Sequence, residues 1–184
     1  MATTKEIKNR IKGVKDTYKI TNAMYMIAST KLRKAKNELD HTRPYFDTLQ
    51  TEIKRLFELD EDVQNQFFCS DYEKYKSTGS FGILVITADK GLAGAYNQNV
   101  IKETMRLMEN HDNAKLFVVG EYGRHYFTSH NISIERSFLY TAQNPTLGRA
   151  RQISNILIEL FKCGELSEID IIYTDMQGAI QSEV

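Results

Sequence analysis

The sequence predicts an α/β protein in which one long N-terminal helix precedes a mostly parallel sheet covered by helices. Three observations lead to this class. Apolar residues recur at alternating spacings of four and three through roughly the first 56 residues. Turn-forming residues then interrupt the pattern, and short apolar runs alternate with helical patterns from residue 81 onward. We therefore expect a coiled-coil helix over residues 1–58, a linker over 59–78 and an α/β domain over 79–184.

The first helix is predicted by a heptad seam. Its positions follow one another along a single face: Ile7, Ile11, Val14, Tyr18, Thr21, Tyr25, Ala28, Leu32, Ala35 and Leu39. The same spacing continues to Leu56. A surface helix that lies on its own domain usually runs for about 8–20 residues. A seam of this length therefore indicates a coiled coil with a partner helix.

Two residues oppose a straight helix. Gly13 costs about 1 kcal/mol relative to alanine in a helix interior, and Pro44 removes one backbone hydrogen bond. Either the helix ends near His41 and a second begins at Pro44, or one helix kinks near Pro44. We favour the kink, because the seam keeps its register across the proline. A second apolar stripe widens the seam in the middle: Ile20, Met24 and Ile27.

The α/β domain is predicted from buried strands that alternate with helices. Strands are expected at residues 81–87, 115–119, 132–138 and 169–174. Helices are expected at residues 97–109, 121–129 and 147–161. Continuous apolar strands separated by helices are typical of a parallel sheet that is covered on both faces. The expected architecture is therefore Rossmann-like.

The composition is that of an ordinary soluble protein, with 26% charged and 41% hydrophobic residues. No apolar run is long enough for a membrane span, and no secretory signal is present.

The net charge is zero, but the charged residues are unevenly distributed, because residues 1–40 carry ten Lys and Arg but four Asp and Glu. This basic helix is either a solvated polar face or the complement of an acidic partner surface. Cys69 and Cys163 form no CxxC pattern, and we expect both to be reduced and structural, in a reducing compartment.

One loop, residues 87–97, could carry chemistry, because it leaves the carboxyl end of the first strand and leads into a helix. Its candidate residues are Asp89, Lys90, Gly91, Leu92 and Gly94. The glycines complete neither GxGxxG nor GxxxxGK[ST]. The alternative is a glycine turn that brings the helix close to the sheet, with Asp89 bonded to backbone amides of its own turn.

No catalytic constellation is apparent elsewhere. The four histidines form no HExxH motif, and we expect surface or partly buried positions for all of them: His41, His111, His125 and His130. No pair of carboxylates has a spacing that predicts acid–base catalysis. We therefore expect no catalytic residue, no metal and no cofactor.

Two motifs resemble one known family. Residues 20–35 read Ile-Thr-x-Ala-Met-x-Met-Ile-Ala-x-x-Lys-Leu-Arg-x-Ala, and residues 86–97 read Ile-Thr-x-Asp-Lys-Gly-Leu-x-Gly-x-Tyr-Asn. Both resemble the gamma subunit of F-type ATP synthase, in the family's order and separation. The resemblance covers the chain but stops short of the family's C-terminal helix, which pairs antiparallel with the first. Position 93 is Ala where many members carry Cys.

The resemblance implies a central rotor stalk that couples proton-driven rotation to ATP synthesis. The expected partners are the alpha and beta subunits of the ring, the epsilon subunit and the c-ring, with the catalytic sites on the beta subunits. Met24, Lys31 and Arg33 are the candidates for the ring interface. Coil packing for Met24, and plain solvation for Lys31 and Arg33, are the alternatives. The implied location is peripheral, on the cytoplasmic face of a bacterial plasma membrane.

Two other functional classes remain open. A nucleotide-binding α/β protein with a helical oligomerisation arm would need a pocket along residues 89–97. A basic-helix DNA binder would use residues 1–40, but a basic zipper places its heptads after the basic region, whereas here the seam runs through it. We therefore expect no nucleic acid partner.

Overall fold

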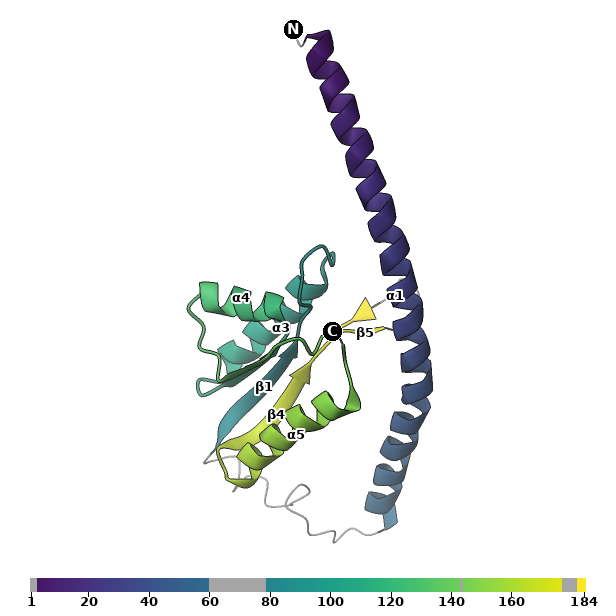
Figure 1. Ribbon diagram of the computed structural model, residues 1–184. Helices are drawn as coiled ribbons and strands as arrows, with labels where there is room; N and C mark the ends of the chain where they lie inside the picture. Colours follow the sequence, from purple (N-terminus) through teal and green to yellow (C-terminus); the bar gives the residue numbers. More distant parts are fainter. Residues whose placement is uncertain (1–2, 60–78, 143, 177–181) are drawn as a thin grey trace. The chain divides into compact units, whose positions relative to one another are not determined.

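The computed structural model describes residues 3–59, 79–142, 144–176 and 182–184 (Figure 1). The chain divides into two units, Met1–Val63 and Gln64–Val184. Within the described residues, the first unit contributes the long helix and the second holds the sheet with its covering helices. The predicted linker at residues 59–78 lies, apart from Leu59, outside the described residues.

Helix α1 runs from Thr4 to Leu59 without interruption (Figure 1). A reciprocal cap opens it: the Thr3 amide donates to Glu6 Oε2 at 2.6 Å, and the Glu6 amide donates to Thr3 Oγ1 at 3.4 Å. These bonds satisfy two amides that would otherwise lack helical partners. The helix continues through Pro44, so the alternative of two separate helices is wrong. A kink at Pro44 stays a prediction.

The second unit is built on a four-stranded parallel sheet in the order β3-β2-β1-β4. The central strand β1, Ser80–Ile86, pairs with β2, Lys115–Val119, on one side and with β4, Leu166–Ile172, on the other. Strand β3, Arg136–Phe138, lies beside β2. The mostly parallel α/β class predicted from the sequence is therefore confirmed.

Helices cover both faces of this sheet, and β1 alternates between the two cores (Figure 1). Ile83 and Val85 pack with α3, Tyr96–Asn110, and α4, Glu121–Ser129. Leu84 faces the opposite way and packs with α5, Leu147–Lys162. The carboxyl end of β1 is therefore held between buried layers, and this arrangement positions the loop that follows it.

The third predicted strand, residues 132–138, is shorter than expected. Only Arg136–Phe138 pairs with β2. Just before this strand, the Glu135 amide donates to the Leu116 carbonyl at 2.8 Å. Before that, the Ile132 amide donates to the Phe127 carbonyl and closes the end of α4. Ile132 and Ile134 still pack against the core, which explains their apolar spacing.

The fourth predicted strand, residues 169–174, begins earlier and ends earlier than expected. β4 starts at Leu166 because Ser80 pairs with Leu166 across a register shift. The Ser167 hydroxyl also donates to the Gly79 carbonyl at 3.3 Å. The apolar pattern did not predict this start, because residues 167–168 are polar. A short antiparallel pair also follows that was not predicted, between β5, Asp175–Met176, and β6, Ser182–Glu183.

Candidate functional site

The loop after β1 runs directly onto the amino-terminal end of α4. Three successive residues of the loop accept hydrogen bonds from three successive amides of the helix, in reverse order. Glu121 N donates to Asp89 Oδ1 at 3.1 Å, Tyr122 N to the Ala88 carbonyl at 3.1 Å, and Gly123 N to Thr87 Oγ1 at 3.0 Å. First-turn amides of a helix are the usual site for a bound anion. Here the chain itself occupies them.

This contact differs from the glycine-turn alternative, in which the Asp89 carboxylate bonds amides of its own turn. Its Oδ1 instead accepts from the first residue of α4, 32 residues away. Its Oδ2 is buried without a hydrogen-bond partner in the described part of the chain. A carboxylate at a helix amino terminus is stabilised by the helix dipole. The role of Asp89 is therefore to attach the loop to α4.

Two glycines allow the close approach that the attachment requires. A Cβ atom at Gly120 would clash with the Thr87 carbonyl oxygen, and Gly120 also has a φ of 98°. A Cβ at Gly123 would lie 2.7 Å from Thr87 Oγ1. Sequence reasoning missed the role of Gly123, although a glycine inside a short predicted helix is a signal for such packing.

The start of α3 is attached to β1 in the same way. Asn97 Oδ1 accepts from the Ala88 amide at 2.9 Å, and the Tyr96 hydroxyl donates to the Ile86 carbonyl at 3.1 Å. Burial raises the pKa of the Tyr96 hydroxyl above its ordinary value. Thr87, Asp89, Tyr96 and Asn97 thus join the end of β1 to two helices, which supports a structural role for these motif residues.

The remaining loop residues face solvent. Lys90, Gly91 and Leu92 are exposed, and the accessible surface of Leu92 is 93% of its fully exposed value. Leu92 and Gly94 adopt left-handed conformations with φ of 63° and 57°. The five predicted loop residues therefore separate into an anchor, Asp89, and an exposed tip that includes Lys90 and Leu92.

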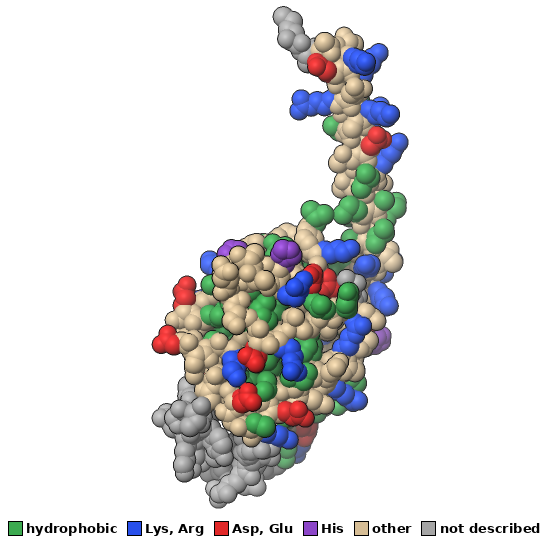
Figure 2. Space-filling model, turned by 60° about the vertical axis from the view of Figure 1, so that its left-hand side comes forward, with side chains coloured by type: hydrophobic (Ala, Val, Ile, Leu, Met, Phe, Trp, Pro, Cys, Tyr) green, Lys and Arg blue, Asp and Glu red, His purple; other side chains and the backbone are tan. Residues whose placement is uncertain are grey.

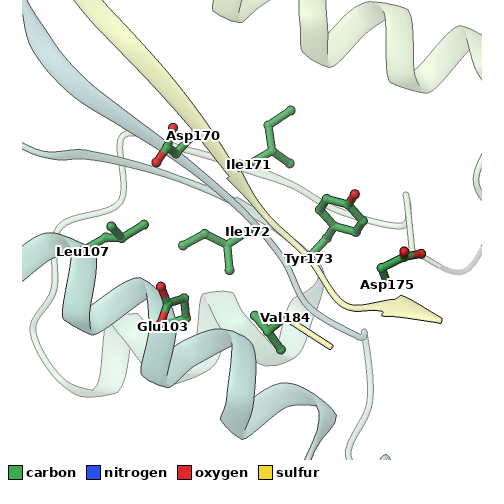
Figure 3. Close-up of a pocket in the computed structure, with 8 residues that line it drawn as sticks. All are labelled: Glu103, Leu107, Asp170, Ile171, Ile172, Tyr173, Asp175 and Val184. Atoms are coloured by element: carbon green, nitrogen blue, oxygen red, sulfur yellow. The ribbon is translucent and has the colours of Figure 1, made fainter. Parts of the chain in front are cut away.

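A cavity of about 560 Å³ lies between α3 and the end of β4 (Figure 3). Glu103, Asp170 and Asp175 contribute carboxylates, and Ile172 lies between Asp170 and Glu103 in Figure 3. Glu103 is already engaged, because Arg106 Nε donates to both of its oxygens at 3.1 and 3.0 Å. This hydrogen bond lowers the pKa of Glu103. The cavity therefore presents separated carboxylates around apolar side chains.

A smaller cavity of about 380 Å³ lies beside α4, lined by Asp89, Glu121, Tyr122, His125, Tyr126 and Ser129. Arg124 pairs with Glu121 and lowers the pKa of that carboxyl. Among the residues that the structure describes, no three or more His, Cys, Asp or Glu side chains gather into a possible metal site. Cys163 is a free, exposed thiol, and Cys69 lies outside the described residues.

Two histidines of the second unit, His111 and His130, stack on aromatic rings. His111 stacks on Phe81 with 3.7 Å between ring centroids, and His130 stacks on Tyr126 at 4.1 Å. His130 Nδ1 also lies 2.8 Å from the Tyr126 carbonyl oxygen. His125 lines the smaller cavity and His41 is exposed on α1. These contacts are those of structural side chains.

The other candidate surface is the whole length of α1. Its seam side chains face solvent within their unit, with 50% of Ile11, 70% of Tyr25 and 59% of Leu32 accessible. Met24 of the second stripe is 48% accessible. Lys31 and Arg33 are exposed on the same helix. The structure thus brings Met24, Lys31 and Arg33 within three turns of one helix, and a role in partner binding stays a prediction for them.

None of the helices in the described ranges combines the length and the apolar character that a membrane span requires.

The family model described as ATP synthase matches residues 3–184. The chain is 42% identical over 177 residues to the ATP synthase gamma chain of Caldanaerobacter subterraneus, covering 96% of this chain and 60% of the relative. It is 36% identical over 183 residues to that of Acetivibrio thermocellus, covering 100% and 61%. The sodium ion specific ATP synthase gamma chain of Acetobacterium woodii is 38% identical, with 95% and 56% covered.

Among solved structures, the chain is similar to one in the rotor of the Euglena gracilis mitochondrial ATP synthase. The TM-score is 0.62 at 15% identity, with 96% of this chain and 58% of that chain covered. At this identity the likeness shows the fold alone. The chain spans about 60% of the length of the first two curated relatives.

Proposed function

Because this chain belongs to the ATP synthase gamma family, we propose that it serves as the central rotor stalk of an F-type ATP synthase. In this proposal α1 lies within the ring of alpha and beta subunits, and the α/β unit meets the epsilon subunit and the c-ring. Proton-driven rotation of the stalk is coupled to ATP synthesis on the ring. The complex would hold the chain at the cytoplasmic face of a bacterial plasma membrane.

One observation supports this proposal above the others. Helix α1 has 56 residues, and its apolar seam is open to solvent within its unit. Leaving a large aliphatic side chain exposed forgoes roughly 1.5–3 kcal/mol of burial. Such a helix gains most of its stability from packing against a partner, which is the arrangement expected of a rod inside a ring.

The rod can act on the ring because its sides differ. Its seam, its second apolar stripe and its basic residues would present different contacts to each surrounding subunit. A partner's equilibrium shifts only when a contact is stronger in one of its states than in another. Rotation of an asymmetric rod would therefore change the nucleotide affinity of each beta subunit in turn.

The chain itself would be non-catalytic, with the catalytic sites on the beta subunits. The first-turn amides of α4, where a phosphate could bind, donate instead to Thr87, Ala88 and Asp89. This occupancy removes the first turn of α4 as a phosphate site; the nucleotide-binding alternative concerns residues 89–97, which lead into α3. The isolated chain is expected to hydrolyse no ATP. Turnover that persists through purification and is abolished by Lys90→Ala would contradict this expectation.

The ring contact can be tested through the basic residues of α1. Affinity of the chain for an isolated ring of alpha and beta subunits is measured by biolayer interferometry at several salt concentrations. Exposed ion pairs contribute about 0.2–1 kcal/mol each, so Lys31→Gln with Arg33→Gln should weaken binding about two- to thirtyfold and reduce its salt dependence. The matched control, Lys102→Gln with Arg151→Gln, removes two exposed charges from the other unit and should leave the affinity unchanged.

Failure of the unmodified chain to bind the ring would refute the rotor proposal. If the affinity changes neither with salt concentration nor on substitution of Lys31 and Arg33, these side chains are merely solvated.

A further inference from the structure

One loop of the α/β unit carries no charged residue. Residues 139–148, named here the clamped loop, run from the end of β3 into the first turn of α5 (Figure 1). Gln143 of this loop lies outside the described residues. Figure 2 shows that Lys, Arg, Asp and Glu side chains are spread over one face of the unit. The clamped loop is therefore a neutral section of a unit whose surface is otherwise charged.

The clamped loop exposes its large apolar side chains. The accessible surface is 66% of the fully exposed value for Tyr140, 68% for Leu147 and 41% for Leu139. Single exposed apolar residues are common on protein surfaces, whereas several together mark a contact with another protein. Tyrosine is also enriched among the residues that contribute most to binding. The composition of the loop is therefore that of a protein-binding surface.

Arg149 holds the clamped loop in one shape. Its Nη1 donates to the Asn144 carbonyl at 3.1 Å and also to the Tyr140 carbonyl. The Arg149 amide donates to the Thr146 hydroxyl at 3.3 Å, which caps α5. The charged group next to the loop is thus engaged within the chain. Tyr140 is consequently held beside the first turn of α5, which begins at Leu147.

Tyr140 has an unfavourable backbone conformation. Its φ of 60° lies in the left-handed region, which is a genuine outlier for a bulky residue. Its side chain is exposed, so burial of the ring within the unit does not compensate for the strain. Strained residues that are held in place by their surroundings cluster at binding sites. The conformation fixed by Arg149 therefore presents an aromatic side chain to a partner.

We propose that the clamped loop binds an uncharged, apolar surface of the epsilon subunit. This inference rests on the proposed rotor function and adds which surface of the α/β unit takes that partner. Permanent protein interfaces are more hydrophobic than transient ones. Contacts between a turning stalk and the ring must form and break at each step, whereas a subunit that turns with the stalk keeps its contact. A preorganised apolar loop suits the second kind of partner.

The first test changes Tyr140. Affinity of the whole chain for the isolated epsilon subunit is measured by biolayer interferometry. Tyr140→Gly removes the aromatic ring and relieves the strain, so it should bind at least about tenfold more weakly. Its unfolding midpoint in urea should stay the same or rise, because glycine accepts a positive φ. Tyr140→Phe keeps the ring and should bind within about threefold of the unmodified chain.

The matched control for this test is Tyr173→Gly. Tyr173 is another exposed tyrosine of the same unit, and it follows β4 rather than β3. Its loss should change the affinity less than about threefold. Equal affinities of Tyr140→Gly and the unmodified chain would overturn the proposal. Equal losses for Tyr140→Gly and Tyr173→Gly would also overturn it, because the effect would not be specific to the clamped loop.

A second test concerns Arg149 as a positioning residue. Arg149→Met keeps a long side chain but cannot donate to the two carbonyls, so the loop should lose its fixed shape. Binding should weaken at least about fivefold, because the loop must then be ordered on association. Arg151→Met removes an exposed charge two residues further along α5 and should have little effect. Unchanged binding of Arg149→Met would overturn the preorganisation of the loop.

Photo-crosslinking identifies the partner in a complex reconstituted from this chain and the alpha, beta and epsilon subunits. The photoreactive residue p-benzoylphenylalanine replaces Tyr140 in one sample and the exposed Thr128 of α4 in the control. A crosslink to the epsilon subunit from position 140, and none from position 128, is the expected result. A crosslink from position 140 to the alpha or beta subunit would overturn the proposal, and so would the absence of any crosslink.

The rotor proposal is decided separately, by binding of the unmodified chain to the ring. A chain that binds the ring but not the epsilon subunit would contradict the inference about the clamped loop and leave the rotor role in place. Failure to bind the ring would remove both.

Discussion

Thr87 and Gly123 are joined by a hydrogen bond across 36 residues of sequence. The amide of Gly123 donates to Thr87 Oγ1 at 3.0 Å, and the same hydroxyl donates to the Val119 carbonyl at 2.9 Å. One side chain thus links the end of β1 to the end of β2 and to the first turn of α4. All three groups are buried, so the stability of the α/β unit should depend on this hydroxyl.

Replacing Thr87 by valine keeps the volume and removes the hydroxyl. The buried Gly123 amide would lose its partner, whereas the Val119 carbonyl would keep the Thr87 amide as a donor. The unpaired amide should cost about 1–3 kcal/mol of unfolding free energy. Urea denaturation followed by fluorescence or circular dichroism measures this loss. Thr128→Val, an exposed threonine of α4, is the control and should change stability by less than about 0.5 kcal/mol. Equal stabilities for both variants would contradict the role of Thr87.

Gly120→Ala tests the close approach of β2 and the loop. Its φ of 98° is unfavourable for any side chain, and its Cβ would clash with the Thr87 carbonyl. Strain of this kind costs on the order of 1–3 kcal/mol. Gly148→Ala, whose Cβ would meet its nearest atom at 4.0 Å inside helix α5, should instead be neutral or mildly stabilising. A Gly120→Ala protein that melts at the unmodified temperature would refute the prediction.

Tyr96→Phe should change how stability depends on pH. Burial raises the pKa of Tyr96 above its ordinary value near 10. The neutral hydroxyl therefore stabilises the folded state fully below pH 10, and this contribution is lost as the pH rises through the folded pKa. The variant loses the hydrogen bond to Ile86, at about 0.5–1.5 kcal/mol near neutrality. The difference in unfolding free energy between the unmodified protein and Tyr96→Phe should therefore become smaller above pH 10.

The measurement for Tyr96 is the unfolding free energy in urea at pH 7, 9 and 10.5. Other tyrosines titrate in both proteins, so only the difference between the curves is informative. Curves that stay parallel to pH 10.5 would mean that the Tyr96 hydroxyl titrates normally.

The open seam of α1 should cause self-association in the absence of a partner. We expect sedimentation coefficients that rise with protein concentration, together with increased helicity. Ile11→Asn with Leu32→Asn removes two apolar seam residues and should shift the association at least about tenfold toward monomer. The control, Lys12→Asn with Lys34→Asn, alters neighbouring charged positions and should not weaken association. A monomer with fully protected amides in α1 would show instead that the helix is stable alone.

Local sequence patterns were sufficient to predict an element where its buried residues followed a single helix or strand period. The bounds of β2 and α4, Lys115–Val119 and Glu121–Ser129, agree with the predicted ranges, because apolar runs there end at glycine or at polar residues. The long helix was visible because its seam repeats over many heptads. The strand prediction was wrong at residues 132–134, because these residues pack against the core with strand-like apolar spacing but do not pair with a neighbouring strand.

The candidate site was only partly visible in the sequence. The loop at residues 87–97 could be located from its place after a buried strand, but its role depends on contacts with residues 121–123. No local pattern records a hydrogen bond across 32 residues. The start of β4 was missed for a similar reason, because it is set by pairing with Ser80 rather than by apolar residues of its own.

The strand order has a consequence for synthesis on the ribosome. β1 is central, yet one of its edges pairs with β4, and Ser80 meets Leu166. At about 5–20 residues per second, that partner emerges roughly 4–17 s after β1. During this interval β1, whose residues 81–85 are buried in the folded unit, presents an unpaired edge, which is a template for aggregation. Nascent chains should therefore need chaperone protection mainly between the emergence of these two strands.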